Sequence, residues 1–402
     1  MRISTGYISQ TFIDNMNNQE TALANTQQQI STGLKFSQPA QDPAAASQSL
    51  DMLATIDQTT QYGTNSNLAQ SRLSIEDSTL TTLTNTLQRV RNLAVQGVNA
   101  TQTADTRSSI AIELKQTLNS IVQIANTQDG SGQYIFAGSA TSTTPFAQSA
   151  TGYAYAGDQT QRLVQIGPNR QVADGDPGSA VFQQVRNGNG TFVVGANTAN
   201  TGSAVIGANT LVNAQQWAAG APPYTLTFTS PTAYTVTDSS APPVSVAAGN
   251  YTDGQSISFN GAQLQVSGTP AANDTYTITP STNQDIFTTV QNLINAFSSG
   301  TPGTAGQAQL QNSVNRVVES LDQSLTNVSN VQSAVGARLN AIDGQNSSNA
   351  DLTLQVKSTL SNLRDLDYAS AITRLNQQMT GLQAAQASFV KIQNLSLFNY
   401  IQ

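Results

Sequence analysis

The chain has 402 residues and few charges: 10% are Asp, Glu, Lys or Arg, against about 25% in ordinary soluble proteins. Its net charge of −7 argues against nucleic acid as a partner. It has no Cys and no His, which excludes disulfides and histidine metal sites and removes the commonest general base. We therefore expect no enzyme, no metal and no cofactor.

The N-terminal segment MRISTGYISQTFIDNMNNQ has neither the apolar run nor the small-residue cleavage site of a secretory signal peptide. No stretch approaches the ~20 apolar residues of a membrane span. We expect no cleaved signal peptide and no membrane insertion.

Residues 1–34 are predicted to be helical. Their apolar residues recur at intervals of four and seven, the spacing of a narrow coiled-coil seam: Phe12, Met16, Leu23 and Ile30. Gln19 and Thr26 are polar seam positions, so the seam is weak. Gly33 suits the position just after a helix end, and Pro39 interrupts regular structure.

Two further helices are predicted next, over 43–99 and 104–128. Asp42-Pro43 supplies an N-cap and a first-turn proline. Each helix carries apolar residues at intervals of three and four, which is typical of one buried face. These residues are Leu73, Leu80, Leu83, Leu87, Val90 and Ala94 in the first helix, and Ile110, Leu114, Leu118, Ile121 and Ala125 in the second.

The middle of the chain, 131–282, changes to short alternating runs separated by turn signals such as Asn187-Gly188-Asn189-Gly190 and Asn260-Gly261. The pattern predicts an all-β insert. The predicted strands are QYIFAG, RLVQIG, GTFVVG, YTLTFT, AYTVTD, SISFNG, AQLQVSG and TYTITP.

Helical periodicity returns at about 284, where an apolar face includes Phe287, Leu293 and Phe297. Longer helices are predicted over about 304–343 and 349–400. Since neither helical arm can bury its apolar stripe alone, we expect the two arms to pack on each other and the two chain ends to lie together.

The predicted fold is therefore α+β: a long antiparallel helical bundle and coiled coil formed by both chain ends, with an inserted all-β outer domain. The predicted domains are a terminal coiled coil (1–42 and 364–402), a helical bundle with a small hairpin (43–140 and 283–363) and a β-rich outer domain (141–282).

Several segments resemble one family. QISTGLKFSQPAQDPAAAS (29–47) resembles the N-terminal signature of flagellins and hook-associated proteins. MRIST and the ending NLSLFNYIQ are similar to the hook–filament junction family, the third hook-associated proteins of bacterial flagella. DGSGQYIFAGSATSTTPF (129–146) resembles that family's hairpin, and SISFNGAQLQVSGTPAANDTYTITP (256–280) resembles a small β module of flagellar axial proteins. Pro43 stands where flagellins usually have a second acidic residue, which favours a junction protein.

The resemblance implies a structural subunit placed outside the cell, between hook and filament. It implies export of the unfolded chain by the flagellar type III system, without a signal peptide. The implied partners are other copies of the chain, hook-associated protein 1, flagellin and a cytosolic export chaperone.

The apolar residues near the two ends are the candidate functional residues. Burying five of them in the last fourteen residues supplies on the order of 10 kcal/mol, while ordering that segment costs roughly 1–2 kcal/mol per residue. We therefore expect the ends to fold when neighbouring subunits supply surface, the alternative being a coiled coil already formed within one chain. The predicted subunit–subunit set is Phe12, Met16, Leu23, Ile30, Ile372, Leu375, Met379, Leu382, Phe389 and Ile392. The predicted chaperone and assembly face is Phe389, Ile392, Leu395, Leu397 and Phe398.

Weaker motifs favour ordinary structural roles. Asp174-Gly175-Asp176 and Asn273-Asp274 lack the ligand spacing of an EF-hand and are interpreted as turns. Asn189-Gly190-Thr191 matches a glycosylation sequon but indicates a hairpin turn first. Trp217, the only tryptophan, is interpreted as core. Two other readings of the whole chain stay open, a short flagellin and an extended surface adhesin.

Overall fold

The computed structural model describes residues 5–150, 152–299 and 303–394. The chain forms two compact units. The first combines residues 1–64 with 345–402, and the second is continuous from 65 to 344. Both chain ends therefore belong to one unit, and the β-rich middle belongs to the other. The division of the chain into three domains stays a prediction.

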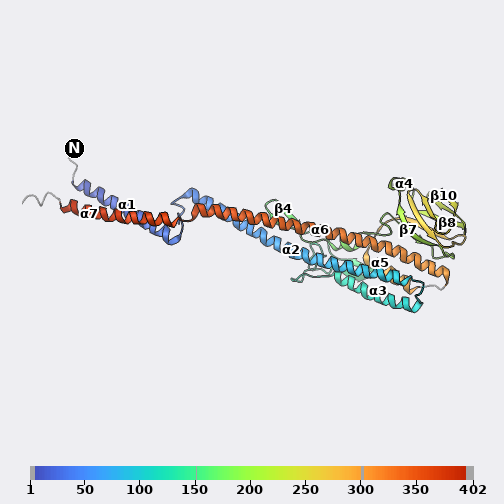
Figure 1. Cartoon of the computed structure of the whole chain (residues 1–402). Helices are drawn as coiled ribbons and strands as arrows, with labels where there is room; N and C mark the ends of the chain where they lie inside the picture. The colour runs from blue at the N-terminus through green and yellow to red at the C-terminus, as the bar shows by residue number, and fades with distance from the viewer. Residues whose placement is uncertain (1–4, 151, 300–302, 395–402) are drawn as a thin grey trace, which may run out of the picture. The chain divides into compact units, whose positions relative to one another are not determined.

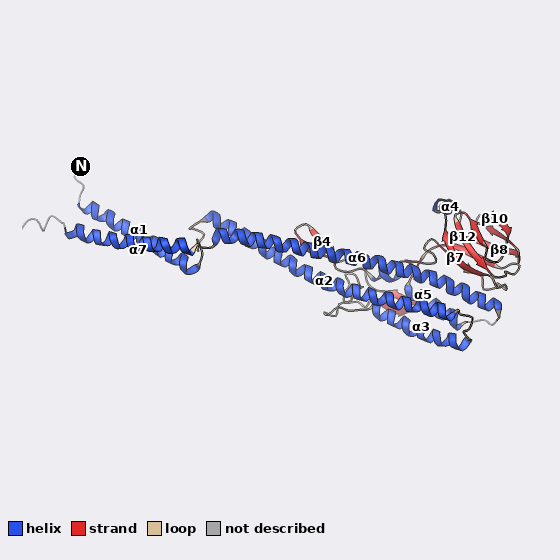
Figure 2. Ribbon diagram, in the orientation of Figure 1, coloured by secondary structure: helices blue, strands red, loops and turns tan. Residues whose placement is uncertain are grey.

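Helices make up the first unit. The N-terminal helix α1 (Thr5–Thr32) packs side by side with the C-terminal helix α7 (Tyr368–Asn394), as Figures 1 and 2 show. The beginning of α2 (Pro43–Gly97) and the end of α6 (Thr304–Arg364) complete the unit. The expected pairing of segments at opposite ends of the sequence is confirmed.

The predicted break between the last two helices is wrong in position. The sequence favoured an interruption between 343 and 349, but α6 is continuous through Gly344 to Arg364. A single glycine destabilises a helix by only about 1 kcal/mol, which is too little to end one that packing supports on both sides. The helix ends instead at Asp365–Asp367, where the Asp367 carboxylate accepts a hydrogen bond from the Ala369 N–H at 3.0 Å and caps α7.

The second unit has a helical bundle as its core. The later part of α2 and the early part of α6 pack with α3 (Ala104–Ala125) and α5 (Ile286–Ser298) around one hydrophobic cluster. The stripes predicted from the sequence supply this cluster, and Leu73, Leu114 and Leu321 are fully buried in it. Thr103 caps α3 with a capping box, and Asp285 caps α5.

A β domain, defined here as the two sheets built from β6 to β13, has a separate hydrophobic core in the same unit. All strand pairs are antiparallel. The five-stranded sheet has the order β10 (Ser245–Asn250), β9 (Ala233–Thr237), β8 (Tyr224–Ser230), β13 (Thr275–Pro280) and β6 (Phe192–Ala196). The three-stranded sheet has the order β11 (Ser256–Phe259), β12 (Ala262–Ser267) and β7 (Val205–Leu211).

Several shorter elements complete the second unit. Three two-stranded ladders pair β1 (Phe146–Ser149) with β2 (Gly152–Tyr155), β3 (Leu163–Gly167) with β4 (Arg170–Ala173), and β5 (Val185–Arg186) with β14 (Asn283–Gln284). A π-helical turn spans Ser179–Gln183, and a short helix α4 spans Ala214–Ala219.

The segment QYIFAG is not a strand, contrary to the sequence prediction. It forms turns in which Ile135, Phe136 and Ala137 are buried. Phe136 contacts Phe182 edge to face, with ring centroids 5.2 Å apart. Among the described residues its β pairing is limited to a single antiparallel bridge between Tyr134 and Gln128. The alternation of apolar residues therefore reflects burial here and not a strand.

Candidate assembly surfaces and the anchor of the β domain

A corner held by backbone hydrogen bonds joins the end of α1 to the start of α7. Gly33 follows α1 with φ +73°, and its N–H donates to Gln29 O at 2.8 Å. Beyond it, the Lys35 N–H donates to Arg364 O at 2.7 Å, and the Leu366 N–H donates to Gly33 O at 2.8 Å. These bonds tie the chain leaving α1 to the chain entering α7. The corner therefore sets the register between the two helices.

The helices α1 and α7 meet along a thin apolar seam. On α1 it contains the predicted residues Phe12, Met16, Leu23 and Ile30, all half-buried, with Thr26 buried among them. On α7 it follows a strict four-three spacing: Ala371, Leu375, Gln378, Leu382, Ala385 and Phe389. The rings of Phe12 and Phe389 have centroids 6.5 Å apart. The structure thus contains the pairing within one chain that the sequence left as an alternative.

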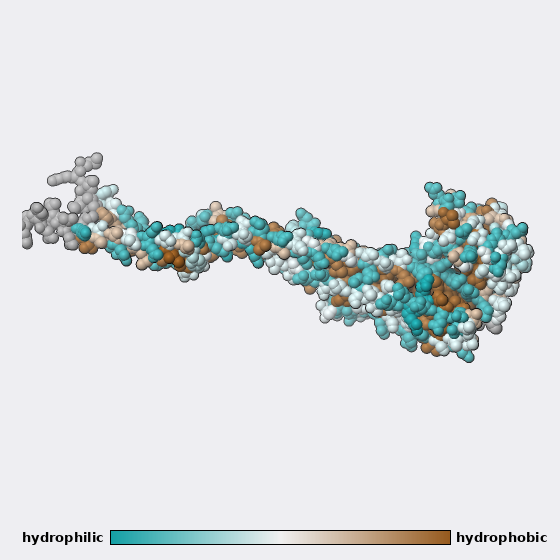
Figure 3. Space-filling model, viewed as in Figure 1, coloured by the Kyte–Doolittle hydropathy of each residue, from teal (hydrophilic) through white to brown (hydrophobic). Residues whose placement is uncertain are grey.

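Other apolar residues of the predicted assembly set lie outside the seam. Ile372 is 48% exposed and Met379 is 42% exposed, and Val390, which the sequence prediction did not include, is 56% exposed. Their spacing of seven and eleven residues places all three on one flank of α7. We call Ile372, Met379 and Val390 the α7 stripe. Figure 3 shows hydrophobic surface, drawn in brown, on the α1–α7 hairpin.

The seam is underfilled at one place, which leaves an open groove of about 410 Å³. The small side chains of Ala22 and Ala385 line this groove together with Phe12 and Gln19. A hairpin with both a groove and an apolar stripe can offer two different surfaces to neighbours.

Part of the predicted C-terminal face lies outside the described residues. Leu395, Leu397 and Phe398 fall there, and so does the side chain of Ile392. Of that set only the side chain of Phe389 is described, and it lies half-buried in the seam.

A row of polar side chains on α6 anchors the β domain. Asn312 accepts from the Ile206 N–H at 2.7 Å and donates to Ala204 O at 3.1 Å. Asn315 donates to Ile206 O at 2.8 Å. One helix face thus bonds the backbone of strand β7 and the residue before it. Sequence reasoning missed this row, because α6 carries many polar residues and the spacing of Asn312 and Asn315 does not single them out.

Glu319 extends the row by one turn. The Asn209 side-chain amide donates to its Oε1 at 2.6 Å. Burial raises the pKa of Glu319 to about 7; the Asn209 amide opposes the shift and Asp322 adds to it.

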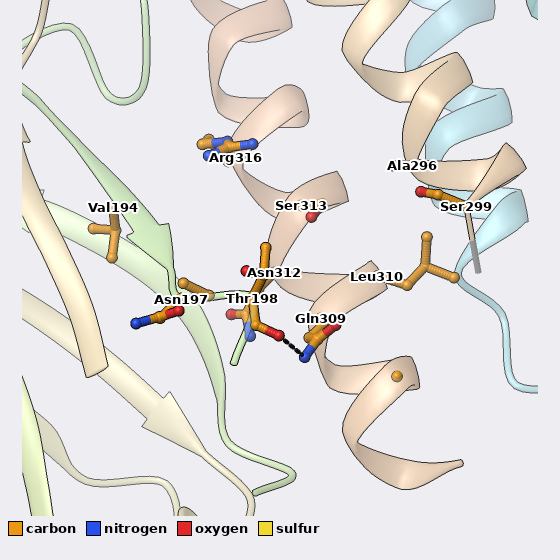
Figure 4. Close-up of a pocket in the computed structure, with 12 residues that line it drawn as sticks. Val194, Asn197, Thr198, Ala296, Ser299, Gln309, Leu310, Asn312, Ser313 and Arg316 are labelled. Carbon is orange, nitrogen blue, oxygen red and sulfur yellow. Dashed lines mark hydrogen bonds between the residues drawn. The ribbon is translucent and has the colours of Figure 1, made fainter. Parts of the chain in front are cut away.

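A cavity of about 430 Å³ lies beside this anchor, between strand β6 and helices α5 and α6 (Figure 4). Gln309 lines the cavity and its side-chain amide donates to Thr198 O at 2.9 Å, the dashed line in Figure 4. Val194, Asn312 and Arg316 line its sides. The cavity is bounded by the groups that hold the β domain to α6.

The weaker sequence motifs have structural partners. Asp174 and Asp176 each form an ion pair with an arginine, and Asp274 accepts from the backbone N–H groups of Thr201, Gly202 and Ala271. The Asn189 side chain donates to Asn209 Oδ1 and accepts from the Thr191 N–H within a turn.

Trp217 packs between Phe192 and Tyr224, which confirms it as core. In the described part of the chain, no group of three or more acidic residues is placed to hold a metal ion. None of the described helices is long and apolar enough to cross a membrane.

Comparison with known proteins assigns the family. Residues 3–141 match the bacterial flagellin N-terminal helical region, and residues 318–401 match the C-terminal helical region. Crystal structures of FlgL resemble the chain throughout their own length. The protein from Xanthomonas campestris is 32% identical, with 76% of this chain and 98% of that chain covered and a TM-score of 0.70. The chain belongs to the FlgL family.

Three further matches agree with a flagellar assignment. The flagellar junction protein FlgL from Legionella pneumophila is 30% identical, with 79% of this chain and 100% of that chain covered and a TM-score of 0.72. The flagellar hook-associated protein 3 of Salmonella typhimurium is 24% identical over 99% of both chains. Residues 195–280 match the D2-like domain of flagellar hook-associated protein 1, in the segment where the sequence resembled a flagellar β module. The family resemblance is confirmed, and so is the α+β fold with a β insert.

Proposed function

We propose that the chain is a structural subunit of the bacterial flagellum and forms the junction between hook and filament. The match to a hook-associated protein 3 over 99% of both chains carries this proposal. The FlgL of Legionella pneumophila is described as a flagellar junction protein, which supports a mechanical role, and we assign no residue to catalysis.

Copies of the chain join through the terminal hairpin. The seam already uses Phe12, Leu382 and Phe389 within one chain, so the α7 stripe is an apolar surface that remains available to a neighbour. The stripe and the groove lie on the same hairpin but are different surfaces. A contact between unlike surfaces repeats from copy to copy and builds a ring or a helix, which is the assembly a junction requires.

One end of this assembly contacts hook-associated protein 1 and the other contacts flagellin. Since both chain ends match flagellin helical regions, the junction presents to flagellin the kind of hairpin that flagellin itself presents.

Before assembly, a cytosolic chaperone covers the C-terminal apolar face. Phe389 belongs to that face and also lies in the seam against Phe12, so chaperone binding and α1–α7 pairing compete for one side chain. The chaperone therefore holds the hairpin open, in a form suited to export of the unfolded chain. Phe389→Ser with Phe398→Ser should weaken chaperone binding and junction assembly together. Unchanged chaperone affinity in a titration would refute the shared use of Phe389.

The junction role is tested by deleting the gene in its host. We expect hooks without filaments and flagellin released into the medium. Normal filaments would refute the junction role, and finding the chain along the whole filament would instead support a short flagellin.

The contact surface is tested by Ile372→Ser with Met379→Ser in the same host. These residues are exposed, so helix content should be retained while the hooks lose their filaments. The matched control is Thr373→Ala with Gln377→Ala, which changes two exposed residues on the other side of α7. Equal filament loss in both variants, or normal filaments in both, would exclude the α7 stripe as the contact.

A further inference from the structure

An unusual concentration of charge lies around the loop 174–178 of the second unit, and all of its carboxylates and two of its three arginines are largely shielded from solvent. Arg72 on α2 pairs with Asp129 at 2.9 Å. Arg162 pairs with Asp174, and Arg338 on α6 holds Asp176 through two bonds of 2.8 and 2.9 Å. Each arginine has its own aspartate, so these six groups together carry no net charge.

Glu76 is a fourth carboxyl group in this cluster and forms no ion pair with any residue that the structure describes. It lies on α2, one turn after Arg72, and is fully buried. Its Oε1 accepts from the Asp176 N–H at 3.2 Å. Its Oε2 is buried and has no hydrogen-bond partner among the described residues, and the same is true of Arg72 Nε.

These two atoms face one small space above Gly175. A Cβ placed on Gly175 would lie 3.7 Å from Glu76 Oε2, 3.7 Å from Arg72 Nε and 3.6 Å from Ile135 O. A carboxyl oxygen that carries a proton can donate into this space, where a carbonyl oxygen or one water molecule can accept. An ionised Oε2 would be an acceptor beside the Ile135 carbonyl and close to Asp176.

We propose that Glu76 is a buried proton-binding site, and that the neutral carboxyl group latches the loop 174–178 between helices α2 and α6. The protonated Oε2 donates toward Ile135 O, while Oε1 keeps the Asp176 N–H. On the other side of the loop, Arg338 holds the Asp176 carboxylate. Losing the proton places an unpaired negative charge next to Asp176 and loosens the loop from α2.

The charges that face Glu76 from each packed element agree with this assignment. Burial is the main cause that raises the pKa of Glu76, to about 8, and Asp176 raises it further. Arg338 from α6 and Arg72 from α2 lower it, but each already neutralises an aspartate. Asp129 and Asp174 are bound by Arg72 and Arg162.

The direction of the pH effect follows from this pKa. A carboxyl group whose pKa is raised from 4.5 in the unfolded chain to about 8 in the folded chain favours folding fully below pH 4.5. That contribution is lost as the pH rises from 4.5 to about 8. The latch is therefore closed in acid and loosens in mild alkali. This inference does not depend on the junction role.

The test compares the full chain with Glu76→Gln, since glutamine has the shape and the donor of a neutral carboxyl group. Thermal unfolding of the second unit is followed from pH 5 to pH 9. The wild-type midpoint should fall by about 5 °C across this range, and the variant should lose most of that fall. Glu113→Gln is the matched control, because Glu113 is an exposed carboxylate paired with Arg89, and it should keep the wild-type profile.

A local measurement makes the test independent of overall stability. Hydrogen exchange at the Asp176 amide, corrected for its intrinsic rate, should become at least about tenfold faster at pH 9 than at pH 5 in the wild type. It should stay protected in Glu76→Gln. The proposal is overturned if Glu76→Gln keeps the wild-type pH dependence, or if the Asp176 amide stays equally protected at both pH values in the wild type.

Discussion

Replacing Asn312 with alanine tests whether the polar row on α6 holds the β domain. Asn312 is 9% exposed and makes two bonds to the chain around β7. In Asn312→Ala the buried Ile206 N–H loses its side-chain acceptor, and a buried donor without an acceptor costs about 1–3 kcal/mol. The Ala204 carbonyl keeps the Tyr276 hydroxyl at 2.8 Å, so losing its second bond costs only about 1 kcal/mol. The expected loss of stability is about 2–4 kcal/mol.

The assay follows from the position of Trp217, the only tryptophan, in the core of the β domain. Its fluorescence reports the β domain during urea unfolding, while circular dichroism reports mainly the helices. We expect Asn312→Ala to move the fluorescence transition to lower urea more than the helical transition. The matched control is Asn330→Ala, an exposed asparagine on the same helix. A shift no larger than that of the control would refute the anchoring role.

Three further predictions concern other parts of the fold. Gly33→Ala should destabilise the α1–α7 corner by about 1–2 kcal/mol, because φ at Gly33 is +73° and a Cβ would lie 2.9 Å from the Tyr368 hydroxyl. Hydrogen exchange of the corner amides measures this loss, and unchanged protection would contradict the prediction. Leu321→Ala should lower the free energy of unfolding of the bundle by about 2–5 kcal/mol, because it leaves a cavity in the core. A loss below 1 kcal/mol would contradict this and show that the neighbouring side chains move in to fill the cavity. The pKa of Glu319 is raised to about 7, so its contribution to stability is full below pH 4.5 and is lost toward pH 7. Glu319→Gln should thus gain about 2 kcal/mol over the wild type at pH 8 and little at pH 4.5, as measured by urea unfolding; equal differences at both pH values would contradict it.

The ordering of the hairpin in a single free copy is a separate question that the seam makes measurable. Its residues are mostly half-buried, because two helices alone cannot enclose a side chain from all directions. The energy gained is therefore close to the entropy lost, as the sequence estimate indicated. We expect weak hydrogen-exchange protection of residues 5–30 and 370–394 in the free subunit, and strong protection would show that the hairpin folds without neighbours.

The helices and their buried faces could be predicted from the sequence, because helical periodicity is a local property of the chain. Leu73, Leu114 and Leu321 were all recognisable as core from their spacing. Strands were found where alternation was regular, as in β8 and β13, and missed where it was not, as in β7 and β10. The strand prediction for QYIFAG was wrong, because a turn can bury apolar residues as well as a strand can.

The family, and with it the flagellar role, was also readable from the sequence, because it is carried by contiguous motifs at the two ends. Only the tertiary structure separated the seam from the α7 stripe, since which side of a helix is covered depends on the helix beside it. Leu375 and Met379 look equivalent in the sequence, yet Leu375 faces α1 and Met379 faces away. The α6 anchor and the Glu76 site were likewise invisible in the sequence. Their partners lie more than ninety residues away along the chain, and burial, which gives each bond its strength, exists only once the chain has folded.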